Sequence, residues 1–110
     1  KMIRTSNINS SKYTTLKKEF KANNLYAVNK NNCYVVYSYG KHFPIYVYKN
    51  KYWYINKDKY SPTTSKQQTQ SKPDTKRIIE KSTYELFKLI DDIGTFKTHY
   101  TWYEQKQLKK

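Results

Sequence analysis

The sequence predicts an α+β domain, in which a small antiparallel sheet of four or five strands packs against one helix from the second half of the chain. Two hairpin-like stretches, at residues 25–39 and 45–55, carry most of this prediction. Each is rich in β-branched and aromatic residues and is interrupted by a polar turn. The third observation is an amphipathic segment at residues 82–94, which predicts the helix.

A chain of 110 residues with no internal repeat fits a single domain. We expect its core to span about residues 13–103 and its ends, 1–12 and 104–110, to be flexible. The first of these ends is polar without a period, which predicts an arm or a short edge strand.

Residues 12–24 predict one or two turns of helix. Leu16 and Phe20 are four residues apart and would share one helix face, and Asn23 or Asn24 would end the helix.

The two hairpins are separated by a predicted break. The first hairpin covers residues 25–39 and turns at "NKNN". Gly40 can adopt positive φ and Pro44 cannot donate to a sheet, so the chain is expected to leave the sheet between them. The second hairpin pairs strands 45–48 and 52–55 across the turn "KNK".

The remaining segments predict a loop, a strand, a helix and a last strand. Residues 57–73 contain one apolar side chain, Tyr60, and predict an exposed loop with the composition of a linker. Residues 75–81 form a short candidate strand. Alternating apolar residues at 95–105 favour a final strand.

The predicted helix at residues 82–94 has clear boundaries. Ser82 and Glu85 have the spacing of a capping box, and Gly94 would end the helix. One face carries the apolar side chains that should pack on the sheet, Leu86, Leu89, Ile90 and Ile93.

Charge is the strongest functional signal. The formal net charge is +14, and residues 1–72 carry 14 basic but only two acidic side chains. Such a surface attracts polyanions by steering and counterion release. The alternative is a merely solvated surface, since lysine has AT-rich codons. Only Arg4 and Arg77 could supply the bidentate contact that reads guanine, which argues against sequence-specific readout of the major groove.

The same composition excludes several classes of protein. His42 and His99 have no carboxylate nearby in sequence, and the lone Cys33 lies in a predicted strand. Two glycines leave no phosphate-binding loop, so we expect no enzyme, no catalytic residue, no cofactor and no metal site. One cysteine permits no intrachain disulfide, and no run of twelve apolar residues occurs. We therefore expect a protein of the host cytoplasm that contacts no membrane.

Aromatic residues supply the candidate stacking surface. The chain has 13 tyrosines, four phenylalanines and two tryptophans, more than its core can bury. Strand alternation places Trp53 and Ile55 on one face and Tyr52 and Tyr54 on the other, where exposed rings could stack on bases. Alternatively, tyrosine merely replaces phenylalanine. The predicted nucleic-acid-binding residues are Lys41, Lys49, Lys51, Tyr52, Tyr54, Lys57, Lys59, Thr63, Thr64, Ser65, Lys66 and Gln68.

Within that set, "TTSKQQ" is the most distinctive polar cluster. Thr63, Thr64 and Ser65 could donate to phosphate oxygens, with Lys66 neutralising the charge and Gln67 or Gln68 bonding a base edge or the backbone. Equally, these side chains could cap turns and bond their own backbone.

The order of motifs across residues 34–70 resembles a small domain of bacteriophage and plasmid proteins. The matching positions are Ser38, Tyr39, Gly40, His42, Pro44, Asn56, Tyr60, Ser61, Thr63, Thr64, Ser65 and Gln68. Gln67 stands where that domain usually has histidine, so a mechanism needing the imidazole is disfavoured. The resemblance implies a mobile-element origin without naming an activity.

Three hypotheses follow. The first is a small basic, tyrosine-rich phage or plasmid protein that binds DNA or RNA through lysine–phosphate contacts and aromatic stacking. The second is an inhibitor of host defence that binds a host protein such as a nuclease. The third is an adaptor, virion or other structural role. The sequence predicts no oligomeric state.

Overall fold

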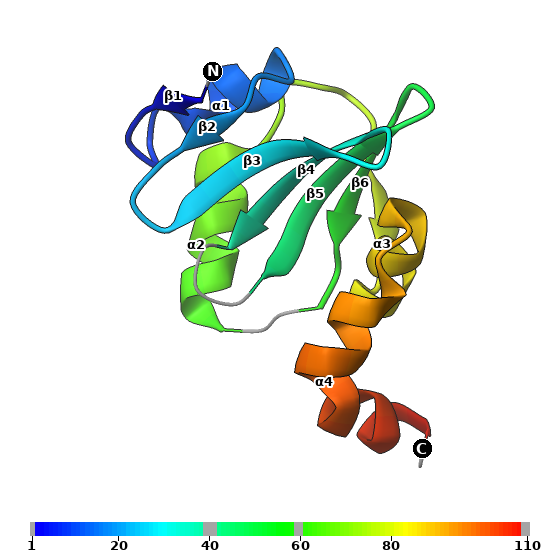
Figure 1. Cartoon of the computed structure of the whole chain (residues 1–110). Coiled ribbons are helices and arrows are strands. Elements are labelled where there is room, and N and C mark those ends of the chain that lie inside the picture. The colour runs from blue at the N-terminus through cyan, green and yellow to red at the C-terminus, as the bar shows by residue number, and fades with distance from the viewer. Residues whose placement is uncertain (1, 39–41, 59–60, 109–110) are drawn as a thin grey trace.

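The computed structural model describes residues 2–38, 42–58 and 61–108, the last eight by their backbone alone. Seven strands form one sheet in chain order (Figure 1). They are β1 (Ile3–Arg4), β2 (Phe20–Lys21), β3 (Leu25–Lys30), β4 (Cys33–Ser38), β5 (Phe43–Lys49), β6 (Tyr52–Asn56) and β7 (Ile79–Lys81). The helices are α1 (Ser10–Thr15), α2 (Pro62–Ser71), α3 (Thr83–Ile90) and α4 (Ile93–Leu108).

The sheet is mixed rather than antiparallel. Strands β2 to β6 form an antiparallel meander, and the two outermost strands, β1 and β7, each pair in parallel with their neighbour. The two predicted hairpins are confirmed as β3–β4 and β5–β6. Strand β7 confirms the short strand predicted at 75–81, and β1 confirms the short edge strand that was one of the two alternatives for residues 1–12.

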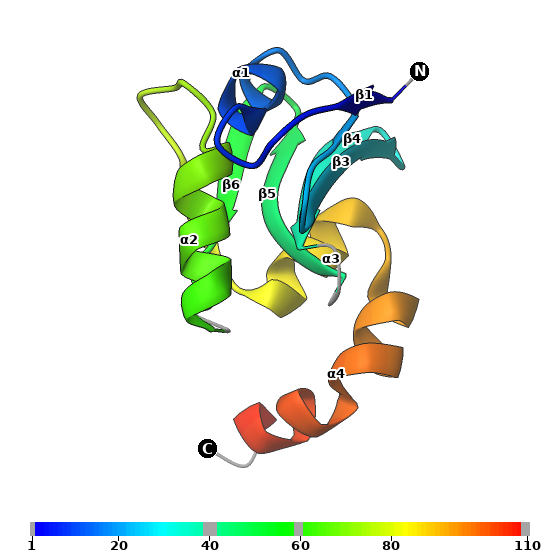
Figure 2. The same ribbon diagram turned by 90° about the vertical axis from the view of Figure 1, so that its left-hand side faces the viewer.

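Helices cover both faces of the sheet (Figure 2). On one face, α1 and α2 lie over a core that includes Phe20, Tyr46 and Trp53. On the other face, Leu86 and Ile90 of α3 pack against a second cluster from β4 and β5. Because helices cover both faces of the sheet, all six residues of β4 are buried. This explains why its sequence does not alternate between apolar and polar side chains.

The predicted four- or five-stranded antiparallel sheet with one helix is therefore wrong. A strand of two residues is too short to show a period, so β2 was not predicted within the stretch expected to be helical. Residues 95–105 were expected to form a strand, yet they belong to α4. Phe96 and Tyr100 are four residues apart and pack together against Phe87 of α3, which is a helical spacing as well as an alternating one.

Two helical predictions are confirmed only in part. Helix α1 overlaps the expected helical stretch only at residues 12–15. Leu16 is 60% exposed and Phe20 lies in β2, so the two share no helix face. Helix α3 begins with the predicted Ser82–Glu85 capping box. It ends at Ile90 because Asp91 adopts a left-handed conformation, and Gly94 lies in α4.

Helix α2 replaces the expected loop at residues 57–73. Its sequence, "PTTSKQQTQS", has no apolar stripe. The buried face is formed by polar side chains at helical spacing, Thr64, Gln67, Gln68 and Ser71. A capping box at Ser61 and Thr64 and a proline in the first turn begin the helix.

Hydrogen bonds take the place of apolar contacts beneath α2. Gln68 Nε2 donates to the backbone carbonyl of Asn56 in β6 at 2.7 Å, and the Tyr46 hydroxyl donates to the Gln68 carbonyl at 2.7 Å. Since buried polar groups are costly unless paired, this polar face is tolerated because most of its atoms have partners.

Asn56 links three parts of the fold. It is fully buried, and its Nδ2 donates to the Pro44 carbonyl at 2.9 Å and to Thr83 Oγ1 at 3.0 Å. Its Oδ1 accepts from the backbone N–H of Asp58 at 2.8 Å. Asn56, one of the positions that carry the resemblance described above, thus joins β6 to β5 and α3.

Among the described residues, no helix is both long and apolar enough to span a bilayer.

Candidate nucleic-acid interface

Both predicted hairpins turn at the same end of the sheet (Figure 1). In a meander, alternate turns meet at one end, so the β3–β4 and β5–β6 turns lie near each other. Each is a two-residue turn: Asn31 and Asn32 have φ of 50° and 65°, and Asn50 and Lys51 have φ of 52° and 72°. Positive φ at both central positions is typical of the type I′ turns that fit the twist of a hairpin, and asparagine tolerates it best after glycine.

A groove of about 650 Å³ lies at this end, which we call the turn-end groove. Three lysines from separate segments line it: Lys17 after α1, Lys30 at the end of β3 and Lys49 at the end of β5. The remaining lining side chains that matter here are Asn29, Asn31, Asn32, Asn50 and Tyr48. Amides and ammonium groups are donors suited to phosphate oxygens.

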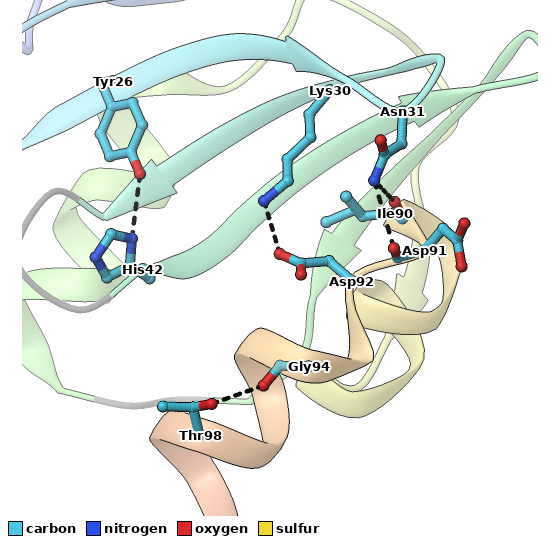
Figure 3. Close-up of polar contacts among 9 residues, drawn as sticks. All are labelled: Tyr26, Lys30, Asn31, His42, Ile90, Asp91, Asp92, Gly94 and Thr98. Carbon is cyan, nitrogen blue, oxygen red and sulfur yellow. Dashed lines mark hydrogen bonds and ion pairs between the residues drawn. The ribbon is translucent and has the colours of Figure 1, made fainter.

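Two of these lysines are held in place by α3 and the residues after it. Lys30 Nζ lies 2.7 Å from the carboxylate of Asp92 (Figure 3). Lys49 Nζ donates to the carbonyl of Leu89 at 2.8 Å, at the C-terminal end of α3. A cation there satisfies an otherwise unpaired carbonyl and complements the helix dipole.

Asn31 caps the same helix end. Its Nδ2 donates to the Ile90 carbonyl at 2.9 Å (Figure 3). The β3–β4 turn is therefore tied to α3, which limits movement of the groove wall.

Lys17 and Lys51 are differently placed. The ammonium group of Lys17 lies 4.4 Å from the centre of the Tyr48 ring, a cation–π contact, and the backbone there has φ of 56°. Lys51 is exposed at the tip of its turn, next to Tyr52, which is 48% exposed. Within the part of the chain that the structure describes, neither lysine is within ion-pair distance of a carboxylate.

Burial and hydrogen bonding shift the pKa of Asp92 in opposite directions. Burial disfavours its charged form, but hydrogen bonds from Lys30 and Thr95 outweigh that effect, so the pKa of the carboxyl is lowered. Asp92 stays ionised at neutral pH and neutralises part of the charge of Lys30. The net charge of the groove is still positive.

The structure divides the predicted binding residues between two ends of the sheet. Lys49, Lys51 and Tyr52 lie at the turn end, whereas Lys57 follows the opposite end of β6. Tyr54 is half-buried against the cluster beneath α3 and does not offer a free ring face as expected. Lys41 and Lys59 lie outside the described residues.

The predicted loop residues are distributed around α2. Thr63 and Lys66 are exposed and Ser65 is half-buried, but Thr64 is 3% exposed and Gln68 is 6% exposed. Thr64 forms the capping box with Ser61, and Gln68 bonds the sheet, so these two side chains serve the fold and not a ligand. The alternative that these side chains cap turns and bond their own backbone is thus supported at Thr64, whereas Gln68 bonds the backbone of a distant strand.

Most tyrosines in the middle of the chain belong to the core. Tyr34, Tyr37 and Tyr46 are at most 4% exposed, and burial raises the pKa of each hydroxyl. Trp53 is buried as predicted, and its ring packs against Tyr48 at 5.1 Å. Among the described tyrosines of the predicted surface, only Tyr52 is exposed enough to stack on a base.

Sequence reasoning missed Lys17, Lys30 and the turn asparagines. A signal was present for Lys30 and the asparagines, because "NKNN" and "KNK" both consist of lysine and asparagine and both were expected to be turns. Lys17 had no such signal. The consequence not anticipated was that consecutive hairpins bring the two turns together. Cys33 also lines the groove, but burial raises the pKa of its thiol, in keeping with its predicted place in the core.

Comparison with known proteins identified no relative. Family models, curated proteins and solved structures were each searched, and none matches this chain. In the described residues, no group of three or more His, Cys, Asp or Glu side chains is arranged to hold a metal ion.

Proposed function

We propose that this protein binds nucleic acid, chiefly through the phosphate backbone, at the turn-end groove. The observation that carries the proposal is the convergence of Lys17, Lys30 and Lys49 on one groove, with Lys51 beside it. Lys30 and Asp92 form the only ion pair among the described residues of a chain with a net charge of +14. The excess of basic over acidic side chains supports a polyanionic partner.

The lysines have different roles in this proposal. Lys30 and Lys49 are held by Asp92 and by the end of α3, and each ammonium group has three N–H donors. Their remaining donors are therefore presented in fixed positions. Lys17 is held only by its cation–π contact with Tyr48, and Lys51 extends from the tip of its turn. These two lysines make the first contacts with phosphate, while Tyr52 offers a ring to an adjacent base.

The same groove favours binding without sequence preference. It is lined by lysine and asparagine, and neither arginine of the chain is among its lining residues. Lysine acts as a point charge toward phosphate and lacks the planar fork that reads guanine. In the phage or plasmid setting that the motif resemblance implies, the nucleic acid would lie in the host cytoplasm.

The test is fluorescence anisotropy of labelled single-stranded DNA, duplex DNA and RNA over a range of salt concentrations. If about five phosphates are contacted, the log–log slope of duplex affinity against salt is about −4.5. Lys51→Gln should reduce the magnitude of the slope by about 0.9 for a duplex and about 0.7 for a single strand.

Lys57→Gln is the matched control, because Lys51 and Lys57 are both exposed and flank the two ends of β6. We expect it to leave the slope unchanged. Equal effects of the two substitutions would mean that basicity as a whole, and not the groove, attracts the polymer. Absence of binding at physiological salt would instead favour the alternative that the protein acts on a host protein.

A further inference from the structure

A second, smaller hollow lies between α2, residues 6–8 and the β2–β3 turn. Its volume is about 260 Å³. The residues that matter here are Asn7, Asn23, Asn24, Lys66, Gln67 and Gln70. We call it the amide pocket. It lies at the beginning of β3 and the turn-end groove at the end, so the two are roughly 17 Å apart along the strand.

The hydrogen bonds determine which way each amide group faces. The backbone N–H of Asn23 donates to Asn7 Oδ1 at 3.1 Å, so the Asn7 NH₂ group must be the donor toward its other neighbours. It donates to Gln70 Oε1 at 3.2 Å and to Asn24 Oδ1. Asn24 and Gln70 therefore use their oxygens within this network, and each keeps an NH₂ group for a ligand.

Gln67 supplies a hydrogen-bond acceptor. It is 2% exposed, and its Nε2 donates to the Asn24 carbonyl at 2.6 Å, which fixes its orientation. Its Oε1 is buried and has no hydrogen-bond partner within the described structure. A buried acceptor without a donor is costly, and a ligand that displaces the side chains covering this oxygen and brings an N–H group to it would relieve that cost.

The pocket thus has several donors around it and one unpaired acceptor buried in its wall. The acceptor is Gln67 Oε1, and the donors are Asn24 Nδ2, Gln70 Nε2 and the exposed ammonium group of Lys66. The complementary ligand has one N–H group among carbonyl oxygens. The imide edge of uracil or thymine has this pattern, with N3–H between two carbonyl groups. Cytosine is the same size, but its N3 is an acceptor.

Pocket volume and base pairing further restrict the ligands that could bind here. A volume of about 260 Å³ is just below the range of roughly 300–1,000 Å³ that is typical of pockets for drug-sized ligands, so a single-ring base fits better than a purine nucleotide. The imide edge is hidden in a duplex and is available only when the base is unpaired.

We propose that the amide pocket binds the imide edge of an unpaired uracil or thymine, with N3–H donating to Gln67 Oε1 and Lys66 near the attached phosphate. This site goes beyond phosphate binding at the turn-end groove, and it would bind a base whether or not the groove binds a strand. The base could belong to a free nucleotide or to a single strand.

The test is titration of ¹⁵N-labelled protein with UMP, CMP and inorganic phosphate to about 10 mM, a concentration that detects a Kd near 1 mM. UMP should bind at least about tenfold more tightly than CMP, as expected for one mismatched base contact. The side-chain NH₂ signals of Asn24, Gln67 and Gln70 should shift. Oligothymidylate and oligocytidylate of equal length then show whether the base belongs to a free nucleotide or to a single strand. Tighter binding of oligothymidylate than of UMP would identify a single strand as the ligand.

Gln70→Glu is the sharpest variant. A carboxylate keeps the acceptor for Asn7 but replaces the NH₂ donor with a second acceptor, so affinity for UMP should fall about tenfold and the preference over CMP should disappear. Lys66→Gln should weaken UMP and CMP alike. The amide spectrum of each variant shows whether it has folded.

Equal binding of UMP and CMP, binding of phosphate alone, or no saturable binding of any of them would overturn the proposal. Lys51→Gln should leave the preference for UMP intact, so failure of the turn-end groove and failure of the amide pocket can be distinguished.

Discussion

Gln68 of α2 donates a hydrogen bond to the backbone carbonyl of Asn56 in β6 at 2.7 Å. This bond joins a helix without an apolar stripe to the centre of the fold. It explains why a segment that looks like a linker forms an ordered part of the domain. It also separates two roles within one sequence cluster, because Gln68 is buried while Lys66, two residues earlier, is exposed.

Gln68→Leu should destabilise the protein by about 1–3 kcal/mol, because it leaves the Asn56 carbonyl without its donor in a buried position. The free energy of unfolding, measured by urea denaturation, checks this. Lys66→Gln on the exposed side of the same helix is the control and should change stability by less than about 0.5 kcal/mol. A negligible effect of Gln68→Leu would show that α2 is not anchored as described.

Ser61→Ala should remove the capping box of α2. The Ser61 hydroxyl accepts from the Thr64 N–H at 3.2 Å, and loss of such a cap costs about 0.5–2 kcal/mol. Thermal unfolding of this variant can be compared with that of Ser65→Ala in the same helix, where no cap is lost. Equal melting temperatures for the two variants would contradict a capping role for Ser61.

The Lys30–Asp92 pair predicts a dependence of stability on pH. The folded pKa of Asp92 lies below its ordinary value of 3.8, so the pair stabilises the fold fully above the unfolded pKa. This contribution is lost as the pH falls through the lowered folded pKa. Asp92→Asn lacks it at every pH, so the difference in unfolding free energy between the two proteins should shrink as the pH falls from 6 toward about 3. A difference that is constant over this range would exclude the ionised pair as its cause.

Lys51→Gly should separate binding from stability. Lys51 has φ of 72°, a conformation that costs a residue with a side chain about 1 kcal/mol or more and suits glycine. The variant should therefore be as stable as the natural protein or more stable, yet bind nucleic acid more weakly. Denaturation and anisotropy on one preparation measure both. Loss of stability together with binding would mean that the lysine acts through the fold.

The sequence predicted the parts of the fold that depend on local sequence signals. Both hairpins, the strand at β7 and the capped start of α3 were visible, because alternation and capping are local signals. Helix α2 was not, since its buried face is made of Thr64, Gln67, Gln68 and Ser71 and depends on partners far away in sequence. Helix α4 was misjudged because Phe96 and Tyr100 satisfy two periods at once.

The candidate site was predicted in a similarly uneven way. Lys49, Lys51 and Tyr52 were identified from charge and aromatic content, and the structure places them near one another. Lys17 and Lys30 became candidates only when the meander brought separate segments to one end of the sheet. The sequence could not predict which way the side-chain amides of the amide pocket face, because the orientation of the Asn7 amide depends on the backbone N–H of Asn23.

The most direct test of the central claim is a map of the backbone amide signals that shift when the protein binds a single-stranded oligonucleotide of about ten residues. Binding at the turn-end groove predicts shifts at Lys17 and across residues 29–32 and 48–52. Shifts confined to Lys57 and the outer face of α2, with the hairpin turns unchanged, would contradict it.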